Sequence, residues 1–240
     1  MMKVIRTSWA VMRKELRIYF LSPLAYVFLA AVLFLSGVFF SLAIAQNEEA
    51  SLRSTISYVA VLLIFCVPLL TMRQLAEESR AGTFELLLTT PLPLSALIVG
   101  KWLATMVLCG ALLLFLGAYV PVLVLYGDPD LATLLTSYLG LYCCCGAFSA
   151  AGLFASSLTR DSMMAGVLGV LILLPFWIAS GALNFLPETT RVWLERASVL
   201  EHLRSFAQGT LDSGDLVWFA GFTGLFLFLT WRSIESRRWR

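Results

Sequence analysis

The sequence has little charge and a single histidine. Charged residues make up 13% of the 240 residues and hydrophobic residues 60%, whereas a soluble globular domain carries about 25% charged and about 45–50% apolar residues. A soluble chain of this length could not bury so much apolar surface, because surface area falls too slowly with size. The composition therefore excludes an ordinary soluble protein and predicts that lipid surrounds most of the chain. The net charge of +2 gives no ground for nucleic-acid binding.

Motifs that carry catalysis or ion transport are also missing. No Lys, Arg, Asp or Glu lies in the middle of a predicted span, where ion-coupled carriers usually place ionisable groups. The phosphate-binding loop GxxxxGK[ST] is absent, because Gly100-Lys101-Trp102 lacks both the upstream glycine and the hydroxyl. No Ser/His/Asp set or acidic metal cluster lies within the apolar runs. We expect a chain that is not an enzyme and holds no ATP, metal or cofactor of its own.

Cysteine and histidine give no sign of a metal or redox site. The five cysteines lie in apolar runs without zinc-site or redox-pair spacing. Three of them are consecutive, Cys143 to Cys145, and neighbouring residues on a helix point in different directions. We interpret the cysteines as packing residues. His202 has no nearby catalytic or metal-binding residue types, so we predict that it packs at the membrane interface.

Long apolar runs make up most of the chain, and we expect no cleavable signal peptide before them. The first run begins after Tyr19 and is already long enough to span. A helix needs about 20 apolar residues to cross a bilayer. Six stretches qualify, which predicts an all-α polytopic membrane protein with transmembrane helices over residues 24–45, 56–72, 103–126, 131–157, 163–183 and 216–231.

Lysine and arginine predict the orientation of these six spans. If the N-terminus is cytoplasmic, 13 of the 17 Lys and Arg residues face the cytoplasm and only 4 face the outside. Positive charge favours the cytoplasmic side of a membrane protein. We therefore predict a multi-pass protein of a bacterial inner membrane with both termini cytoplasmic. The four outer residues are Arg53, Arg191, Arg196 and Arg204.

Three segments outside the spans have their own patterns. Residues 3–20 combine apolar residues at helical spacing with arginines on other faces, which predicts an amphipathic helix in the inner headgroup layer. Residues 73–97, between spans two and three, predict a charged helix, a break at Gly82, a second short helix and then two prolines. Residues 184–215 predict one or two short amphipathic helices on the outer surface.

The cytoplasmic segment carries a family resemblance. Residues 77–91, EESRAGTFELLLTTP, are followed by Gly100-Lys101 and preceded by the opening Arg13-Lys14-Glu15-Leu16 and Ser22-Pro23. This pattern resembles the ABC-2-type permeases, the membrane subunits that pair with a separate ATP-binding-cassette ATPase. Within them it is most similar to the gliding-motility-type and nitrous-oxide-maturation-type permeases.

The resemblance implies a single transmembrane domain over residues 1–240, working as the permease of an ATP-driven exporter. It implies an ABC ATPase that binds ATP and Mg²⁺, a second permease copy or a paralogue, contact with membrane lipid, and room for an extracytoplasmic accessory protein. The residues that match the family motifs, or lie beside them with charge, are our candidates for the ATPase-coupling interface. They are Arg13, Glu15, Glu77, Glu78, Arg80, Gly82, Thr83 and Glu85.

Two other functions fit parts of the same pattern. A membrane assembly or scaffold protein could use the charged segment to recruit a cytoplasmic partner without transporting anything. An intramembrane enzyme is disfavoured, because the spans lack a catalytic set. Neither the substrate nor the direction of transport follows from these residues, although the apolar spans favour a lipidic or amphipathic cargo.

Overall fold

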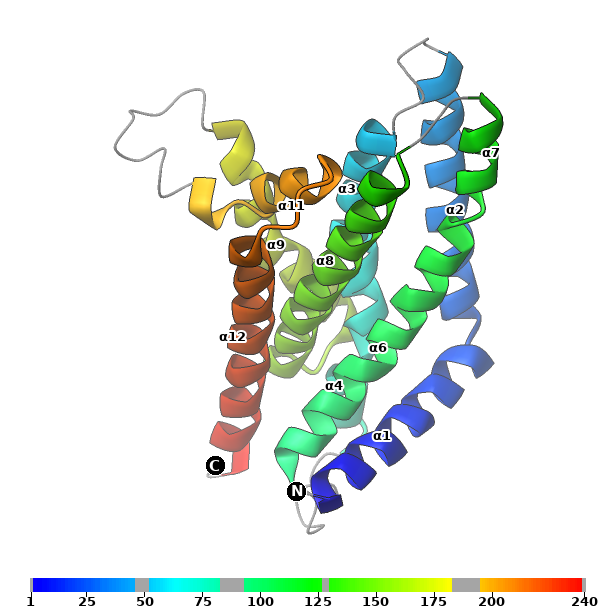
Figure 1. Cartoon of the computed structure of the whole chain (residues 1–240). Helices are drawn as coiled ribbons and strands as arrows, with labels where there is room; N and C mark the ends of the chain where they lie inside the picture. Colours follow the sequence, from blue (N-terminus) through cyan, green and yellow to red (C-terminus); the bar gives the residue numbers. More distant parts are fainter. Residues whose placement is uncertain (1, 46–51, 83–92, 127–129, 183–194, 239–240) are drawn as a thin grey trace.

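A computed structural model describes residues 2–45, 52–82, 93–126, 130–182 and 195–238 of the chain. Helices are the only regular elements among these residues, and they form an elongated bundle (Figure 1). The helices are α1 (Met2–Leu21), α2 (Pro23–Ala45), α3 (Leu52–Thr71), α4 (Arg73–Arg80), α6 (Leu94–Leu116), α7 (Tyr119–Tyr126), α8 (Leu131–Leu158), α9 (Ser162–Ala182), α11 (Val199–Ala207) and α12 (Ser213–Arg238).

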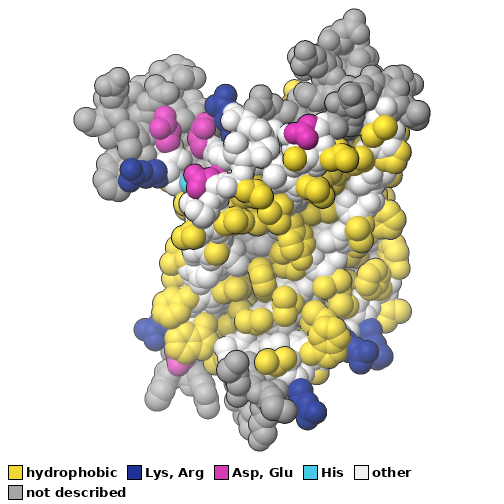
Figure 2. All heavy atoms as spheres, in the orientation of Figure 1, with side chains coloured by type: hydrophobic (Ala, Val, Ile, Leu, Met, Phe, Trp, Pro, Cys, Tyr) yellow, Lys and Arg dark blue, Asp and Glu magenta, His cyan; other side chains and the backbone are white. Residues whose placement is uncertain are grey.

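Six stretches of helix in the described residues are long and apolar enough to cross a membrane. They lie on α2, α3 continuing into α4, α6 with the start of α7, α8, α9 and α12. On the face shown in Figure 2, hydrophobic side chains form a broad band, and charged side chains lie above and below it. The prediction of an all-α polytopic membrane protein with six spans is therefore confirmed.

The two ends of the bundle differ. The start of α1 and the end of α12 lie at the same end, which we call the base (Figure 1). Helix α4 also lies toward the base. We call the opposite end the top, and α11 lies there across the ends of the longer helices.

Helix α8 is the centre of the bundle and packs against α3, α4, α6, α9, α11 and α12. Its small residues allow this close packing, because a helix without bulky side chains admits neighbouring backbones. A Cβ atom on Gly140 would lie 2.8 Å from Cβ of Phe206 on α11. Farther along, the Trp102 indole of α6 donates a hydrogen bond of 3.0 Å to the carbonyl of Gly146. Cys144 and Cys145 are buried in this core, and the cysteines of the described residues are not joined by disulfides.

Helix α1 lies along α6 and does not continue into α2, which begins directly at Pro23 (Figure 1). Proline is favoured in the first turn of a helix, where its missing N–H costs no hydrogen bond. The face of α1 toward the bundle buries Ser8, Met12, Glu15 and Tyr19. The residues predicted to form one apolar face of α1 lie on two different sides of the helix. Met12 is buried, whereas Ile5 and Trp9 are more than half exposed.

The third span begins earlier than the sequence analysis predicted, at Leu94 rather than Leu103. Lys101 is the reason for the difference. A lysine normally marks the end of an apolar run, but here the side chain is 1% exposed and lies inside the helix–helix contacts. Its charge is balanced by carboxylates from two other helices.

Candidate functional site

Lys101 is the centre of a buried ion cluster at the base, where α1, α4 and α6 meet. Its ammonium group lies 2.7 Å from Oε1 of Glu15 on α1 and 2.9 Å from Oε1 of Glu78 on α4. It also donates a hydrogen bond of 2.8 Å to the backbone carbonyl of Gln74. A buried ion loses several kcal/mol of solvation, so this lysine needs all three partners. The cluster therefore binds α1 and α4 to the same point on α6.

A second polar network continues from this cluster toward the membrane. The side-chain amide of Gln74 donates to the hydroxyls of Tyr19 and Thr105, and to the carbonyl of Lys101 at 3.3 Å. The Tyr19 hydroxyl donates to the carbonyl of Leu70 at 3.4 Å. Burial raises the pKa of Tyr19, so its phenol stays neutral and keeps its proton for this bond. The network joins the same helices with directional contacts.

Ser156 attaches α4 to the central helix. Its hydroxyl accepts hydrogen bonds from the backbone N–H groups of Leu75 at 3.1 Å and Ala76 at 3.0 Å, and donates to the carbonyl of Met72 at 2.8 Å. The first N–H groups of a helix have no partner within the helix. Met72, which precedes α4, supplies no side-chain cap. A serine from α8 supplies it instead, so these hydrogen bonds join α4 to α8.

The predicted coupling residues divide into two groups. Glu15 and Glu78 converge on Lys101, with side chains that are 6% and 15% exposed. Glu15 and most of Glu78 are thus inside the protein rather than on its surface. Lys14 reaches the same carboxylate from the exposed side of α1, with its Nζ 3.6 Å from Oε1 of Glu78.

The second group of predicted residues is exposed at the base. The Arg13 guanidinium lies 6.0 Å from the centroid of the Trp9 ring, and Nε of Arg73 lies 3.2 Å from Oε1 of Glu77. Arg80 is exposed at the last residue of α4. Gly82 follows with a φ of +69°, a left-handed conformation that favours glycine. Thr83 and Glu85 lie outside the described residues.

Lys101 is the residue that the sequence analysis missed. In the sequence analysis Lys101 belongs to the family motif and to the cytoplasmic charges, but not to the candidate site residues. A signal was present, because Leu97-Ile98-Val99 precede it and Trp102-Leu103-Ala104 follow it. A lone cation between apolar runs needs a buried anion, and the acidic residues on nearby amphipathic segments were the candidates.

The cavities beside these groups are small or shallow. The cavity at the ion cluster is about 130 Å³, and it is lined by Glu15, Tyr19, Gln74 and Lys101 among others. Pockets for small molecules are larger, about 300–1,000 Å³. The base cluster is therefore a structural joint and not a substrate pocket. No group of His, Cys, Asp and Glu side chains able to hold a metal ion occurs in the described part of the chain.

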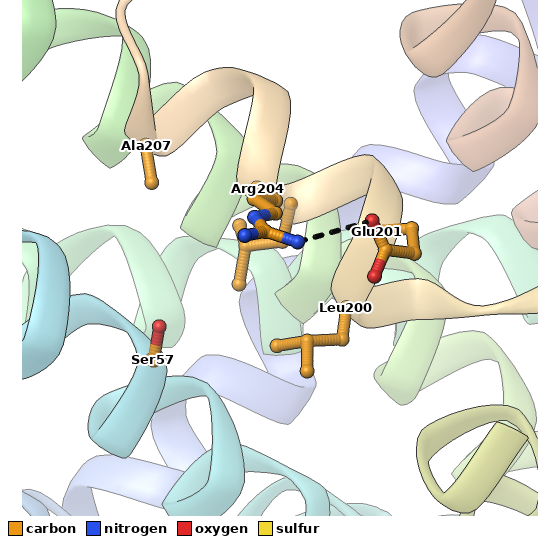
Figure 3. Close-up of a pocket in the computed structure, with 6 residues that line it drawn as sticks. Ser57, Leu200, Glu201, Arg204 and Ala207 are labelled. Atoms are coloured by element: carbon orange, nitrogen blue, oxygen red, sulfur yellow. Dashed lines mark ion pairs between the residues drawn. The ribbon is translucent and has the colours of Figure 1, made fainter. Parts of the chain in front are cut away.

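A second cavity, of about 200 Å³, lies at the top between α3 and α11 (Figure 3). Leu200, Leu203 and Ala207 supply its apolar wall, and Ser57 of α3 faces them. Its two charged groups pair with one another, with Nη1 of Arg204 3.8 Å from Oε2 of Glu201.

The described residues thus form a multi-pass membrane protein in which α1 and α4 are bound to α6 at the base. The family model of the ABC-2 type transporter matches residues 6–211, which is most of the chain. The chain belongs to this family. A search of curated proteins finds no match to the chain. The protein is therefore a permease subunit of an ABC transporter, a kind of subunit whose ATPase resides in a partner.

Proposed function

We propose that this permease drives export, and that α1 and α4 together form the base unit that receives the movement of the ATPase. The observation that carries the proposal is Lys101, which holds Glu15 of α1 and Glu78 of α4 on one ammonium group inside α6. A buried ion pair resists separation, because parting the ions would leave each charge without compensation. The two helices therefore move as one body when either is pushed.

The path from the base unit into the spans has two branches. One runs through Lys101 into α6, and the other runs through Ser156 into α8. Helix α8 packs against six other helices, so a tilt of α8 changes the packing of most spans. In this mechanism ATP-driven closure of the partner displaces α4, and the displacement re-arranges α6 and α8 together.

The ATPase docks, in this proposal, on the exposed part of the predicted interface. Arg13, Glu77 and Arg80 present both signs of charge at the base. Charge complementarity of this kind governs the orientation and specificity of a complex. Gly82, Thr83 and Glu85 continue the same segment and remain candidates for the contact. Glu15 and Glu78 act behind this surface, where they position the base unit.

The proposal also covers the membrane, the number of permeases, the partner proteins and the cargo. The base faces the cytoplasm of a bacterial inner membrane, two permeases form the pathway as copies or paralogues, and the ATPase binds ATP and Mg²⁺. An extracytoplasmic accessory protein is a further partner. The cargo is lipidic or amphipathic, which is supported by the apolar composition of the spans. A role like that of the gliding-motility-type or nitrous-oxide-maturation-type permeases rests on the sequence motif alone.

Docking is tested by co-purification with the partner ABC ATPase. The double variant R13E/R80E is expected to weaken the complex by at least about tenfold, because it reverses two rim charges. R204E is the matched control, since Arg204 is exposed at the opposite end. If R13E/R80E leaves both complex formation and ATP turnover intact, the docking surface is wrong. If the wild type captures no ATPase but binds another cytoplasmic protein, the scaffold hypothesis replaces the permease function.

Transmission is tested separately, with spin labels at Ala81 and Ser236, which are exposed at the ends of α4 and α12. In the wild-type complex the distance between the labels should change when ATP is added. In the neutral variant E15Q/K101M/E78Q the ATPase should still bind, and the change in distance should disappear. An unchanged response would show that the ion cluster does not transmit the movement.

A further inference from the structure

A third cavity is a shallow groove between α8 and α12, close to the end of α12 at the base. Its volume is about 800 Å³, which is within the range of ligand pockets, about 300–1,000 Å³. Its apolar lining residues precede the polar ones along α12. The apolar residues are Phe154, Leu158 and Leu229, and the polar residues are Arg232, Ser233, Glu235 and Ser236. The groove is thus amphipathic along the direction of the bundle.

The apolar part of the groove continues along α12 toward the top. Leu225, Leu229, Arg232 and Ser236 are spaced four, three and four residues apart, so they share one side of the helix. Leu225 is 53% exposed, and a Cβ atom on Gly221, one turn further, would meet nothing within 4 Å. Gly221 and Arg232 are about 16 Å apart along the helix axis. One leaflet of a bilayer contributes about 15 Å of hydrocarbon, so this open side has the length of an acyl chain.

The polar part of the groove contains one cation and one anion side by side. Nη1 of Arg232 lies 3.4 Å from Oε2 of Glu235, and the two side chains are 64% and 32% exposed. An exposed pair of this kind contributes little to stability, and each member can still contact a ligand. The groove is therefore complementary to a ligand with a positive and a negative group, and less so to a ligand of one charge.

The hydroxyls and helix ends near this pair favour a cation that has N–H groups. Helix α8 ends at Leu158, and the last carbonyls of a helix lack intrahelical partners and form the negative end of its dipole. The Ser233 hydroxyl donates to the Ser157 carbonyl at 3.4 Å, and the Ser236 hydroxyl donates to the Ser233 carbonyl at 2.9 Å. Each hydroxyl oxygen can then accept a hydrogen bond from a ligand.

We propose that the groove between α8 and α12 binds a phospholipid with a primary-amine headgroup, such as phosphatidylethanolamine. Its phosphate lies on Arg232, its ammonium group donates to Glu235, and one acyl chain follows α12 toward Gly221. Phosphatidylglycerol would place its net negative charge beside Glu235, and phosphatidylcholine has no N–H group to donate. This inference does not depend on the ATPase, on the base unit or on the identity of the cargo.

The test is native mass spectrometry of the full chain in detergent, titrated with dioleoyl phosphatidylethanolamine, phosphatidylcholine or phosphatidylglycerol. Phosphatidylethanolamine should bind on the order of tenfold more tightly than either of the others, the effect of one charge-assisted hydrogen bond. Equal affinities would overturn the proposal, because they would indicate unselective contact with lipid. A preference for phosphatidylglycerol would overturn it as well, because the charge of the headgroup would then be the cause.

E235Q tests the position of the ammonium group. It should reduce phosphatidylethanolamine affinity to that of phosphatidylcholine and leave phosphatidylcholine binding unchanged. E201Q is the matched control, because Glu201 pairs with Arg204 at the same spacing on α11, at the top. E201Q should keep the wild-type preference. A preference that survives in E235Q, or one that is lost in E201Q, would refute the assignment to this groove.

Leu158→Trp tests the apolar part of the groove. Leu158 is 47% exposed, so the larger side chain can enter the groove without displacing the core. It should weaken the binding of all three lipids, whereas E235Q affects phosphatidylethanolamine alone. Unchanged lipid binding in a folded Leu158→Trp protein would show that the lipid does not occupy the groove.

Discussion

At the scale of single residues, Lys101 shows how the base depends on a few charges. Two carboxylates and one ammonium group share a space from which water is nearly excluded. The net contribution of such a cluster to stability is small, because the loss of solvation offsets the attraction. Removing one member is different, since it leaves the others buried without compensation. The cluster therefore specifies which helices meet at the base more than it stabilises them.

Lys101→Met should destabilise the chain by about 3–5 kcal/mol, because Glu15 and Glu78 would then face each other without a cation. The measurement is thermal unfolding in nanodiscs. Lys14→Met is the matched control, because Lys14 is 60% exposed and its pair with Glu78 is at the surface, where a pair is worth about 1 kcal/mol or less. The triple variant E15Q/K101M/E78Q should recover most of the stability that Lys101→Met loses. A triple variant as unstable as Lys101→Met would mean that packing, not charge, is the cause.

Asp130 caps the first turn of α8 and gives a prediction for pH. Its carboxylate accepts hydrogen bonds from the Thr133 hydroxyl at 2.8 Å and the Ala132 N–H at 3.1 Å. These bonds hold the pKa of Asp130 below its usual value. A lowered carboxyl pKa contributes stability above the unfolded pKa, and this contribution is lost as pH falls through the folded pKa. Asp130→Ala should therefore lower the melting temperature at pH 7, and the difference should shrink toward pH 3. A constant difference would exclude the ionised cap as its source.

At the scale of helices, close packing at the base depends on Gly100. A Cβ atom there would lie 2.8 Å from the Ser8 carbonyl oxygen and 2.8 Å from the Val11 Cβ atom on α1. Neither group can rotate away, since one is backbone and the other is branched. The absence of a side chain therefore allows α1 to approach α6 closely enough for Glu15 to reach Lys101.

Gly100→Ala should separate α1 from α6 and lower the melting temperature, although alanine is the better helix former by about 1 kcal/mol. Gly221→Ala is the matched control, because a Cβ atom on Gly221 of α12 would meet nothing within 4 Å. It should be neutral or slightly stabilising. The measurement compares the melting temperatures of Gly100→Ala and Gly221→Ala in the same lipid. Equal shifts in both variants would show that the α1–α6 contact adapts to a side chain.

The sequence predicts the helices of this protein better than the contacts between them. Apolar runs of spanning length are a local property, so six spans could be recognised from composition alone. The start of α6 could not, because Lys101 is neutralised by Glu15 and Glu78, which precede it by many residues. The cap that Ser156 supplies to α4 and the pairing of His202 with Asp215 are equally non-local. Spacing along one helix contains no information about such partners.

At the scale of the whole molecule, the charge distribution suggests how the bundle lies in a membrane. The beginning of α1, helix α4 and the end of α12 lie at the base (Figure 1), and 10 of the 17 lysines and arginines belong to α1, α4 and the end of α12. The positive-inside tendency predicts that the base faces the cytoplasm. This orientation would put the base unit within reach of a cytoplasmic ATPase.

Cysteine labelling in intact cells tests this orientation. Ala81→Cys adds an exposed thiol after α4 at the base, and Gln208→Cys adds one after α11 at the top. A membrane-impermeant maleimide should label Gln208→Cys in intact cells, and it should reach Ala81→Cys only after the membrane is opened. The native cysteines supply the background, which is measured on the unmodified chain. Labelling of Ala81→Cys alone in intact cells would invert the orientation and place the base, with Arg13 and Arg80, out of reach of any cytoplasmic ATPase.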